Sequence, residues 1–298
     1  MSLNAHRRAD LALGGITGGA AFIILLVLAL IAWDVLSNGL SQLSWEFISA
    51  APREGMTEGG IFPAIFGTVA LVLLMTVAVV PVGVITAVYL YEYARQDGLF
   101  ARLIRGAVYN LAGVPSIVFG LFGLGFFIQF IGGRMDAFWY PGEVVWGQPA
   151  ILWASLTLAV LTLPVVIVAT EEALRTVPRE HREAALALGS TRFEALVRII
   201  LPQALPGILT GAILAVARGA GETAPILFTG AAYFLPYLPT HPNDQFMNLG
   251  YHVYVLATQS PDIEATKPIL YGTVLVLLLV TALLNVAAMV LRSRLRAA

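Results

Sequence analysis

Two charged side chains stand inside an otherwise apolar run over residues 205–233, in the segment ARGAGETAP. Arg218 lies near the middle of that run, and Glu222 follows four residues later. An Arg centred in a bilayer costs about 2.5–3.5 kcal/mol on insertion scales, so such a residue is expected to line a cavity or to have a partner. Residues four apart share a helix face, which allows the two side chains to pair.

The chemistry of Arg218 and Glu222 indicates a pathway for an anion. A guanidinium group matches a tetrahedral oxyanion with two parallel hydrogen bonds. Arg preceding Glu is the less favourable order for an intrahelical pair, which argues against a purely structural role. Gly219 and Gly221 weaken the helix at the same place. A self-neutralising structural pair is the alternative interpretation.

Motifs for other chemistry are absent from the sequence. The chain has no cysteine, which excludes disulfides and thiolate metal sites. None of the four histidines lies in an H-E-x-x-H motif, and there is no G-x-S-x-G motif. The single lysine, Lys267, is in Thr-Lys-Pro and not in a phosphate-binding G-x-x-x-x-G-K-[ST] loop. We therefore expect no enzymatic activity in this chain, and any ATP hydrolysis must come from a separate polypeptide.

Composition predicts a membrane protein. The 298 residues are 58% hydrophobic and 12% charged, whereas a soluble domain carries about 25% charged residues. Apolar runs long enough to span a bilayer predict an all-α, polytopic protein with six transmembrane helices. The runs are roughly 12–36, 61–91, 108–132, 149–170, 205–233 and 268–291. We divide the chain into an N-terminal helix with an outer loop, 1–60, and a transmembrane core, 61–298.

The basic residues orient these spans, because cytoplasmic loops are enriched in Lys and Arg. Of the 17 basic residues, 13 fall on one side of the membrane. They are Arg7, Arg8, Arg95, Arg102, Arg105, Arg175, Arg179, Arg182, Arg192, Arg198, Arg292, Arg294 and Arg296. Only Arg53, Arg134 and Lys267 fall on the other side. Both termini and the loop between spans four and five are therefore predicted to be cytoplasmic.

That cytoplasmic loop contains a polar, helix-prone stretch, EAALALGSTRFEALVRIILP, over residues 183–202. Gly189 is a natural C-terminal stop for a first helix. Thr191 and Glu194 have the spacing of a capping box, which predicts the start of a second helix. We expect Pro202 to end that second helix. The pattern predicts two short helices with a sharp turn between them, which a partner protein is able to grip.

The same loop resembles the signature of ABC-importer permeases, the EAA motif. Its fixed positions are matched by Glu183, Ala184, Ala185, Gly189, Ile199, Leu201 and Pro202. The resemblance implies a permease domain of the type I importer kind, with a coupling loop over about 171–204. The coupling helix of such a permease sits in a groove of an ATP-binding subunit. An ordinary amphipathic connector between two spans is the alternative.

Longer segments resemble the permeases of the bacterial phosphate-specific importer, and its A-type permease more than its sister. They are GGIFPAIFGTV at 59–69, NLAGVPSIVFGLFGLG at 110–125 and ILTGAILAVARGAGETAPIL at 208–227. The pore-helix Arg and Glu of that family fall on Arg218 and Glu222. Thr223 and Ser116 are added as candidates that line the substrate pathway.

The resemblance also implies partners and a location. The expected partners are a homologous permease of the PstC type, two ATP-binding subunits, an extracytoplasmic phosphate-binding protein, and phosphate. No cofactor is expected on this chain, since ATP is used by the partner subunit. The expected location is the bacterial plasma (inner) membrane. No nucleic-acid partner is expected, because the charge balance offers no basic face.

Two other functions are compatible with these residues. A permease for another oxyanion, such as sulfate, molybdate or phosphonate, would use the same arginine chemistry. An ion-driven secondary transporter would also use an intramembrane Arg–Glu pair, but it has no reason to carry the EAA motif, and no inverted repeat of the first three spans is visible.

Overall fold

The computed structural model describes residues 3–56, 58–95, 98–260 and 262–297. Nearly all regular structure is helical, and one short hairpin of β1 and β2 is the exception in this part of the chain. The elements are α1 (Leu3–Gly39), η1 (Leu40–Gln42), α2 (Trp45–Ser49), β1 (Pro52–Arg53), η2 (Glu54–Met56), β2 (Glu58–Gly59), α3 (Phe62–Val88), η3 (Tyr89–Tyr93), α4 (Leu99–Ala112), α5 (Ser116–Phe122), η4 (Gly123–Gly132), α6 (Gly133–Trp139), α7 (Ile151–Arg175), α8 (Arg179–Ala187), α9 (Arg192–Ala195), η5 (Leu196–Ile200), α10 (Leu201–Gly221), α11 (Leu249–Thr258) and α12 (Ile263–Ala297).

Six helical segments are long and apolar enough to cross a membrane, which confirms the predicted number of spans and the all-α class. They run over Leu11–Gln42, Phe62–Tyr93, Ser116–Trp139, Ile151–Arg175, Arg192–Gly221 and Ile263–Arg294. The first, second, fourth and sixth agree closely with the predicted runs. The third and fifth do not, and the differences bear on the candidate site.

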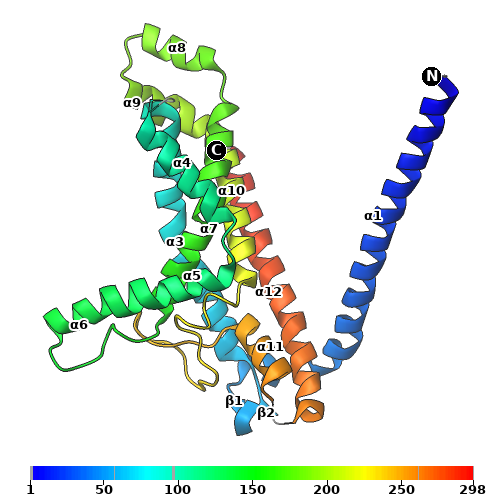
Figure 1. Cartoon of the computed structure of the whole chain (residues 1–298). Coiled ribbons are helices and arrows are strands. Elements are labelled where there is room, and N and C mark those ends of the chain that lie inside the picture. Colours follow the sequence, from blue (N-terminus) through cyan, green and yellow to red (C-terminus); the bar gives the residue numbers. More distant parts are fainter. Residues whose placement is uncertain (1–2, 57, 96–97, 261, 298) are drawn as a thin grey trace.

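The centre of the molecule is a bundle in which α3, α7, α10 and α12 run side by side (Figure 1). Small residues let the backbones of α7 and α10 approach closely. A β-carbon added to Gly207 would collide with Ala173, and one added to Gly211 would collide with Ala169. Packing of this kind is the usual way for helices to associate in a membrane, where the hydrophobic effect does not drive them together.

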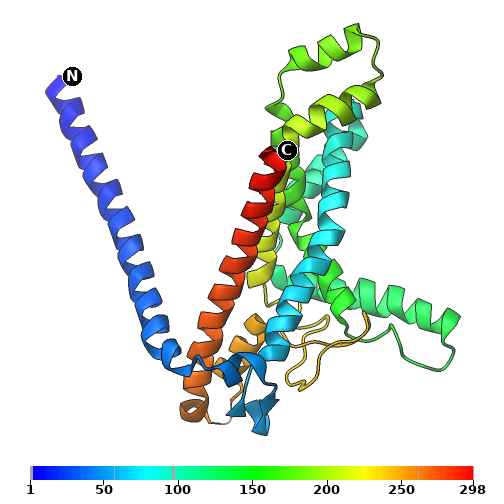
Figure 2. The same cartoon turned by 180° about the vertical axis from the view of Figure 1, so that it is seen from behind.

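Helix α1 stands apart from the bundle and approaches α12 only near its own C-terminal end (Figure 2). There the hydroxyl of Tyr271 donates a hydrogen bond to Asp34 Oδ2 at 2.9 Å. Gly39 packs directly on the backbone of Tyr271. Most described side chains of α1 before Val35 are exposed and apolar, so this helix presents a long unpartnered surface within the single chain.

The third predicted span, 108–132, is wrong in its boundaries. Residues 108–112 belong to α4, and the chain then breaks before Pro115, whose backbone is extended with ψ 139°. The residue before a proline is disfavoured in a helix, which explains the break. From Ser116 the elements α5, η4 and α6 form one rod that continues to Trp139 and projects sideways from the bundle (Figures 1 and 2).

The fifth predicted span, 205–233, is also displaced. Its helix begins at Arg192 and passes Pro202 without ending, contrary to the prediction for that residue. The π-helical turn η5 immediately precedes α10, and such turns help a helix to accommodate the missing N–H of a proline. At the other end α10 stops at Gly221, and the chain continues without regular helix until α11.

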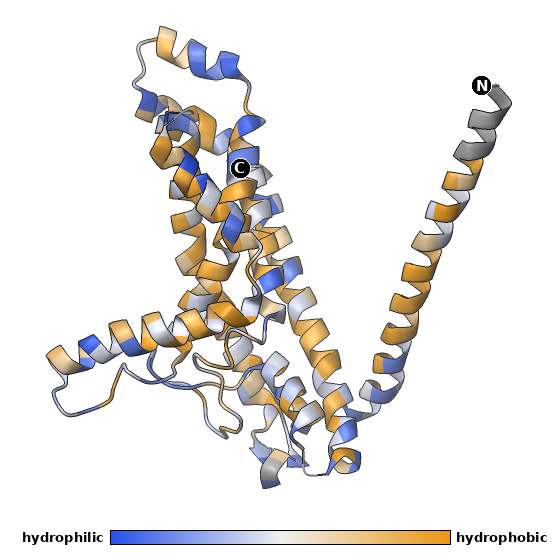
Figure 3. Ribbon diagram, in the orientation of Figure 1, coloured by the Kyte–Doolittle hydropathy of each residue, from blue (hydrophilic) through white to orange (hydrophobic). Residues whose placement is uncertain are grey.

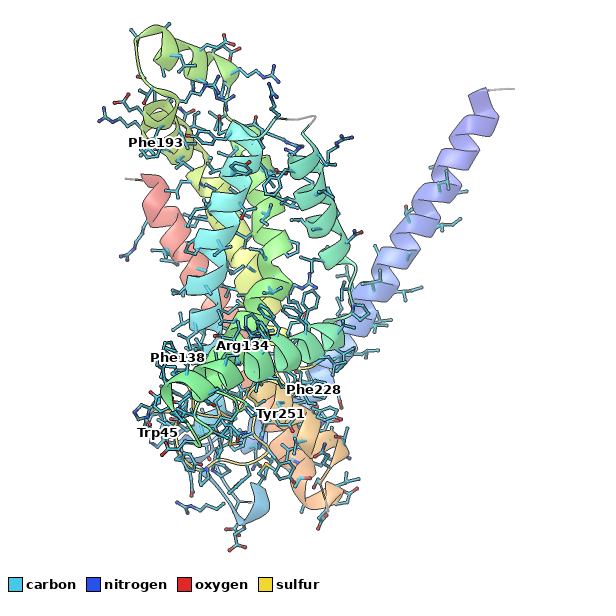
Figure 4. All side chains as sticks on the ribbon, turned by 60° about the vertical axis from the view of Figure 1, so that its left-hand side comes forward. Trp45, Arg134, Phe138, Phe193, Phe228 and Tyr251 are labelled. Carbon is cyan, nitrogen blue, oxygen red and sulfur yellow. The ribbon has the colours of Figure 1, made fainter. Side chains whose placement is uncertain are left out.

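The molecule has two chemically different ends. Helix α8 lies at one end, together with α9, and is markedly hydrophilic compared with the long helices (Figure 3). The opposite end holds the β1–β2 hairpin, α2, α11 and the loop 222–248 (Figure 1). Phe193 lies at the α8 end, whereas Trp45 and Tyr251 lie at the hairpin end (Figure 4). The N-terminal end of α1 and the C-terminal end of α12 are on the side of α8 (Figure 1).

Candidate functional site: an exposed helical loop and an arginine at the middle of the bundle

Helix α8 ends in a turn that its sequence dictates. Gly189 has a φ of +87°, a left-handed conformation that side chains other than glycine rarely adopt. The amide of Ser190 donates to the carbonyl of Ala185, and the amide of Gly189 donates to that of Leu186, at 3.1 and 3.0 Å. These two bonds form a Schellman motif, which satisfies carbonyls that a helix end leaves free. The predicted stop at Gly189 is confirmed.

The second helix of the loop begins at the predicted capping box. The hydroxyl of Thr191 accepts a hydrogen bond from the amide of Glu194, and the carboxylate of Glu194 accepts one from the amide of Thr191. Each residue thereby satisfies a backbone donor that would otherwise be free. The two caps together define the sharp turn between α8 and α9.

The residues of the EAA motif divide between an outer and an inner face of α8. The motif residues Glu183, Ala184 and Gly189 are exposed. Leu188, which precedes Gly189 and is not part of the motif, has 87% of its surface accessible. Ala185 is buried. Leu188 thus adds an apolar side chain to the exposed end of a hydrophilic helix.

The remaining motif residues lie after the turn, on the rod formed by α9, η5 and α10. Ile199 and Leu201 are half-buried, and Pro202 is exposed. Their neighbours Leu196 and Ile200 are buried against Leu174 of α7, in a cluster that joins the loop to the bundle. This second half of the motif therefore supports the loop.

Arg218 and Glu222 form the predicted pair at the C-terminal end of α10. Arg218 Nε lies 3.5 Å from Glu222 Oε1. Glu222 is the C-cap of the helix and is extended, with ψ 129°, so the pair spans the helix end. The side chain of Arg218 is 41% exposed and that of Glu222 is 20% exposed.

The end of α10 lies at the middle depth of the bundle. A β-carbon on Gly219 would collide with the side chain of Met75, which is the central residue of the 27-residue α3. In the described residues, Arg218 makes one polar contact, through Nε to Glu222. A guanidinium has five N–H donors, so most of the donors of Arg218 are available to a ligand.

The two pore-lining candidates lie in the surroundings of this pair. Thr223 follows Glu222 and packs on the first turn of α11, where its Oγ1 would be 2.5 Å from a β-carbon built on Gly250. Ser116 is the first residue of α5, whose Gly120 packs on Pro225 of the same loop. The described structure shows no hydrogen bond from either hydroxyl to Arg218. In the same residues no group of three or more His, Asp or Glu side chains is placed to hold a metal ion.

Two partly buried ion pairs near the α8 end were not found by sequence reasoning. Arg105 Nε of α4 lies 3.5 Å from Glu171 Oε1 of α7, and a second nitrogen of Arg105 donates to the carbonyl of Leu90. Arg182 of α8 pairs with Glu92 of η3. Both pairs join residues far apart in sequence, so periodicity does not reveal them. The only available signal was charge at the ends of apolar runs.

Residues 79–297 match the family described as "Binding-protein-dependent transport system inner membrane component". The match includes the α8 loop and the end of α10. The chain belongs to this family. It is thus the membrane component of a transport system that depends on a binding protein.

Relatives of this permease cover nearly its whole length. It is 33% identical over 287 residues to the "Probable ABC transporter permease protein YqgI" of Bacillus subtilis, covering 92% of each chain. It is 34% identical over 278 residues to the "Phosphate transport system permease protein PstA 1" of Mycobacterium tuberculosis, covering 91% of this chain and 85% of the relative. A "Probable phosphate transport system permease protein PstA" of Methanocaldococcus jannaschii is 31% identical, covering 89% of this chain and 87% of the relative.

Solved structures place the permease in the fold of ABC importers. A bacterial alginate ABC transporter, in complex with its pentasaccharide-bound periplasmic protein, matches 99% of this chain and 98% of the other with a TM-score of 0.68 and 13% identity. An inward-facing MetNI methionine ABC transporter matches 78% of this chain and 94% of its own, with a TM-score of 0.56 and 18% identity. At these identities the likeness concerns the fold alone.

Proposed function

We propose that this chain is the permease subunit of an ATP-driven phosphate importer. In this role it forms the translocation pathway and couples it to a separate ATPase subunit. The relatives named as phosphate permeases align over about nine-tenths of this chain, which supports a shared substrate. The exposed EAA face of α8 supports coupling to a partner that supplies the energy.

The observation that carries the proposal is the exposed guanidinium of Arg218 at the middle depth of the bundle. An anion that leaves water loses its hydration, and a cation with free N–H donors offsets part of that cost. A planar guanidinium also fits two oxygens of a phosphate at once.

Glu222 limits how tightly the anion is held. Its carboxylate already interacts with Arg218 Nε, so an arriving phosphate competes with an internal partner. Such competition weakens the bound state and favours release on the far side. Glu222 is also able to accept the proton of a protonated phosphate that binds beside it.

Energy enters at α8. In our proposal the exposed Glu183, Ala184 and Leu188 contact a groove of the ATP-binding subunit, and ATP binding moves α8 together with that subunit. The pathway then alternates between an outward-open and an inward-open form. The chain itself performs no catalysis and binds no cofactor, and ATP is used by the partner.

The assembly follows from this role. The permease lies in the bacterial inner membrane with both termini and α8 in the cytoplasm, in agreement with the distribution of basic residues. A homologous permease of the PstC type completes the pathway, two ATP-binding subunits dock on the α8 loops, and an extracytoplasmic binding protein delivers phosphate to the hairpin end.

Purification followed by transport tests the proposal. The tagged permease is expressed with its genomic neighbours, and the copurifying chains are identified by mass spectrometry. The complex is reconstituted in vesicles, and uptake of labelled phosphate is measured with ATP and binding protein. We expect an ATPase subunit to copurify and uptake to require ATP. Uptake driven by an ion gradient without ATP would contradict the proposal.

A permease for another oxyanion is the second candidate, because the relative YqgI is named without a substrate and a guanidinium also fits sulfate. Competition distinguishes the two. Excess unlabelled phosphate should abolish the uptake signal, whereas sulfate, molybdate and phosphonate should leave it unchanged. Preferential competition by one of these anions would transfer the assignment to it.

A further inference from the structure

Helix α8 is only loosely attached to the bundle. A cavity of about 250 Å³ lies between it and the end of α3, lined by Tyr91, Glu92, Arg182, Leu186, Arg192, Ala195 and Ile200. In the described part of the chain, two polar side-chain contacts join α8 to the helices behind it. One is the exposed contact between His181 Nδ1 and Gln203 Oε1 at 2.7 Å, and the other is the ion pair of Arg182 with Glu92.

The ion pair is the better protected of the two contacts. The side chain of Arg182 is 29% exposed and that of Glu92 is 13% exposed. The guanidinium carbon of Arg182 also lies 5.7 Å from the ring centre of Tyr91, within the range of a cation–π interaction. Charge pairs that are partly removed from water interact more strongly than exposed ones, because they are screened less.

The partner of Arg182 lies in an irregular part of the bundle. Glu92 and Tyr91 belong to η3, the π-helical turn at the end of α3, and such turns are frequently found at functional sites. The neighbouring Leu90 accepts the hydrogen bond from Arg105, which in turn pairs with Glu171 of α7. Side chains of α4 and α8 therefore contact one short turn, and α7 is joined to it through Arg105.

We propose that the pair of Arg182 and Glu92 transmits the movement of α8 to α3 during transport. The inference rests on the proposed function, because it assumes that a partner moves α8. Arg182 is a positioning residue in this scheme: it makes α8 and η3 move as one unit across a cavity that would otherwise let α8 move alone. Movement of η3 then reaches α4 and α7 through Arg105.

Removal of the charge on Glu92 is the first test. The complete importer with Glu92→Gln, which keeps the shape of the side chain, is reconstituted with its binding protein. The readout is the number of phosphate ions imported per ATP hydrolysed. We expect this ratio to fall by about tenfold, a typical size for the loss of a close charge pair, while the ATPase subunits still copurify. An unchanged ratio would overturn the proposal.

The matched control is the pair of Arg175 and Glu172, which lies in the last turn of the transmembrane helix α7, before α8 begins. Both of its side chains are exposed, and it joins residues of one helix. The variant Glu172→Gln makes the same chemical change. It should leave the ratio unchanged. An equal fall in both variants would show that the effect is not specific to Arg182, and would overturn the proposal.

Cross-linking provides a rescue that a merely structural role would not produce. The native chain has no cysteine, so Arg182→Cys combined with Glu92→Cys introduces the only two thiols of this subunit. We expect low phosphate import per ATP with free thiols. A short, reducible bifunctional thiol reagent should restore the ratio to within about twofold of the unaltered importer. Restoration should be lost again on reduction.

Persistent uncoupling after cross-linking would overturn the proposal. Loss of the ATPase subunits from the double variant would also overturn it, because Arg182 would then be a docking residue. Failure of the proposed function is distinguishable from both outcomes. In that case the unaltered complex itself would show no phosphate uptake linked to ATP hydrolysis.

Discussion

The arginines near the two ends of the rod formed by α9, η5 and α10 differ in their partners and in their exposure. Near its beginning, Arg182 and Arg105 pair with carboxylates on other helices, and those carboxylates are at most 13% exposed. At its end, Arg218 pairs with a residue one turn away, and 41% of its side chain stays accessible. We interpret the charges that join distant elements as structural, and we propose that Arg218, whose partner is local, keeps most of its donors for a ligand.

This difference in exposure predicts that one group of charges matters mainly for stability and the other mainly for transport. A buried carboxylate that loses its partner destabilises the fold, because its charge is then uncompensated. Removal of Arg218 also leaves a carboxylate without its partner, but Glu222 is more accessible, at 20% exposed, so the effect on stability should be small. In our proposal the larger loss is the site for an anion. Substitutions at the two ends should therefore change different measurable quantities.

The largest expected change in stability is at Arg105. Replacement by alanine leaves Glu171, whose side chain is 8% exposed, without its ion pair. Loss of one partner of such a pair costs about 3 kcal/mol. Thermal unfolding of the purified permease in detergent should show a clear fall in the melting temperature for Arg105→Ala.

Arg175→Ala is the control for that experiment, because it breaks an exposed pair near the same end. Exposed pairs contribute less than about 1 kcal/mol, so its melting temperature should be nearly unchanged. Equal melting temperatures for the Arg105 and Arg175 variants would contradict a structural role for the buried pair.

The largest expected change in transport is at Arg218. Loss of the hydrogen bonds from a guanidinium to an anion costs about 1.5–3 kcal/mol, so Arg218→Ala should slow phosphate uptake about 10- to 150-fold at limiting phosphate. The melting temperature should stay within a degree or two of the unaltered protein. Arg218→Lys should recover part of the uptake. Normal uptake by a fully assembled Arg218→Ala complex would show that this residue has no role in the pathway.

A third prediction concerns pH at the hairpin end. Burial lowers the pKa of His252 in α11 to about 4, and its ring nitrogens make no hydrogen bond among the described residues. The folded protein keeps this imidazole neutral, while the unfolded chain takes up a proton below about pH 6.5. Stability from this residue is present above pH 6.5 and is lost as pH falls toward 4. The free energy of unfolding should fall by about 2 kcal/mol between pH 7.5 and 5.

Melting curves over this pH range check the prediction for His252. The variant His252→Gln should lose that part of the pH dependence. The exposed His241 provides the comparison, since His241→Gln should retain it. Identical pH dependence in the two variants would show that His252 is not the group responsible.

The smallest effect is expected at Gly189. A side chain there meets open space, so the cost arises from its φ of +87° and amounts to about 1–2 kcal/mol for an L-residue. Gly189→Val should therefore disturb the α8 turn and lower phosphate import per ATP several-fold. Gly142, with a φ of +91° and equally open space, is the control. Gly142→Val should leave the ratio unchanged, and an equal loss in both would remove the special role of the α8 turn.

Local structure was predictable where it depends on neighbouring residues. The Schellman turn at Gly189 and the capping box of Thr191 and Glu194 need only backbone and side-chain groups a few positions apart. The sequence therefore predicted both, and the structure confirms them. The pairing of Arg218 with Glu222 was predictable for the same reason.

Features that depend on distant residues were missed. The boundaries of the third and fifth spans were wrong because hydropathy does not register the break before Pro115 or the continuation of the helix past Pro202. The pairs Arg105–Glu171 and Arg182–Glu92 join residues 66 and 90 positions apart, and a single sequence carries no signal of such contacts.

Coupling through α8 requires that this helix face the cytoplasm, where a nucleotide-hydrolysing partner reaches it. Single cysteines in this cysteine-free chain test that directly, at Leu188 of the loop, 87% exposed, and at Tyr237 of the opposite end, 64% exposed. Intact cells are treated with a membrane-impermeant maleimide. We predict that the Tyr237→Cys protein is labelled and the Leu188→Cys protein is labelled only after the cells are opened. Labelling of Leu188→Cys in intact cells would contradict the account.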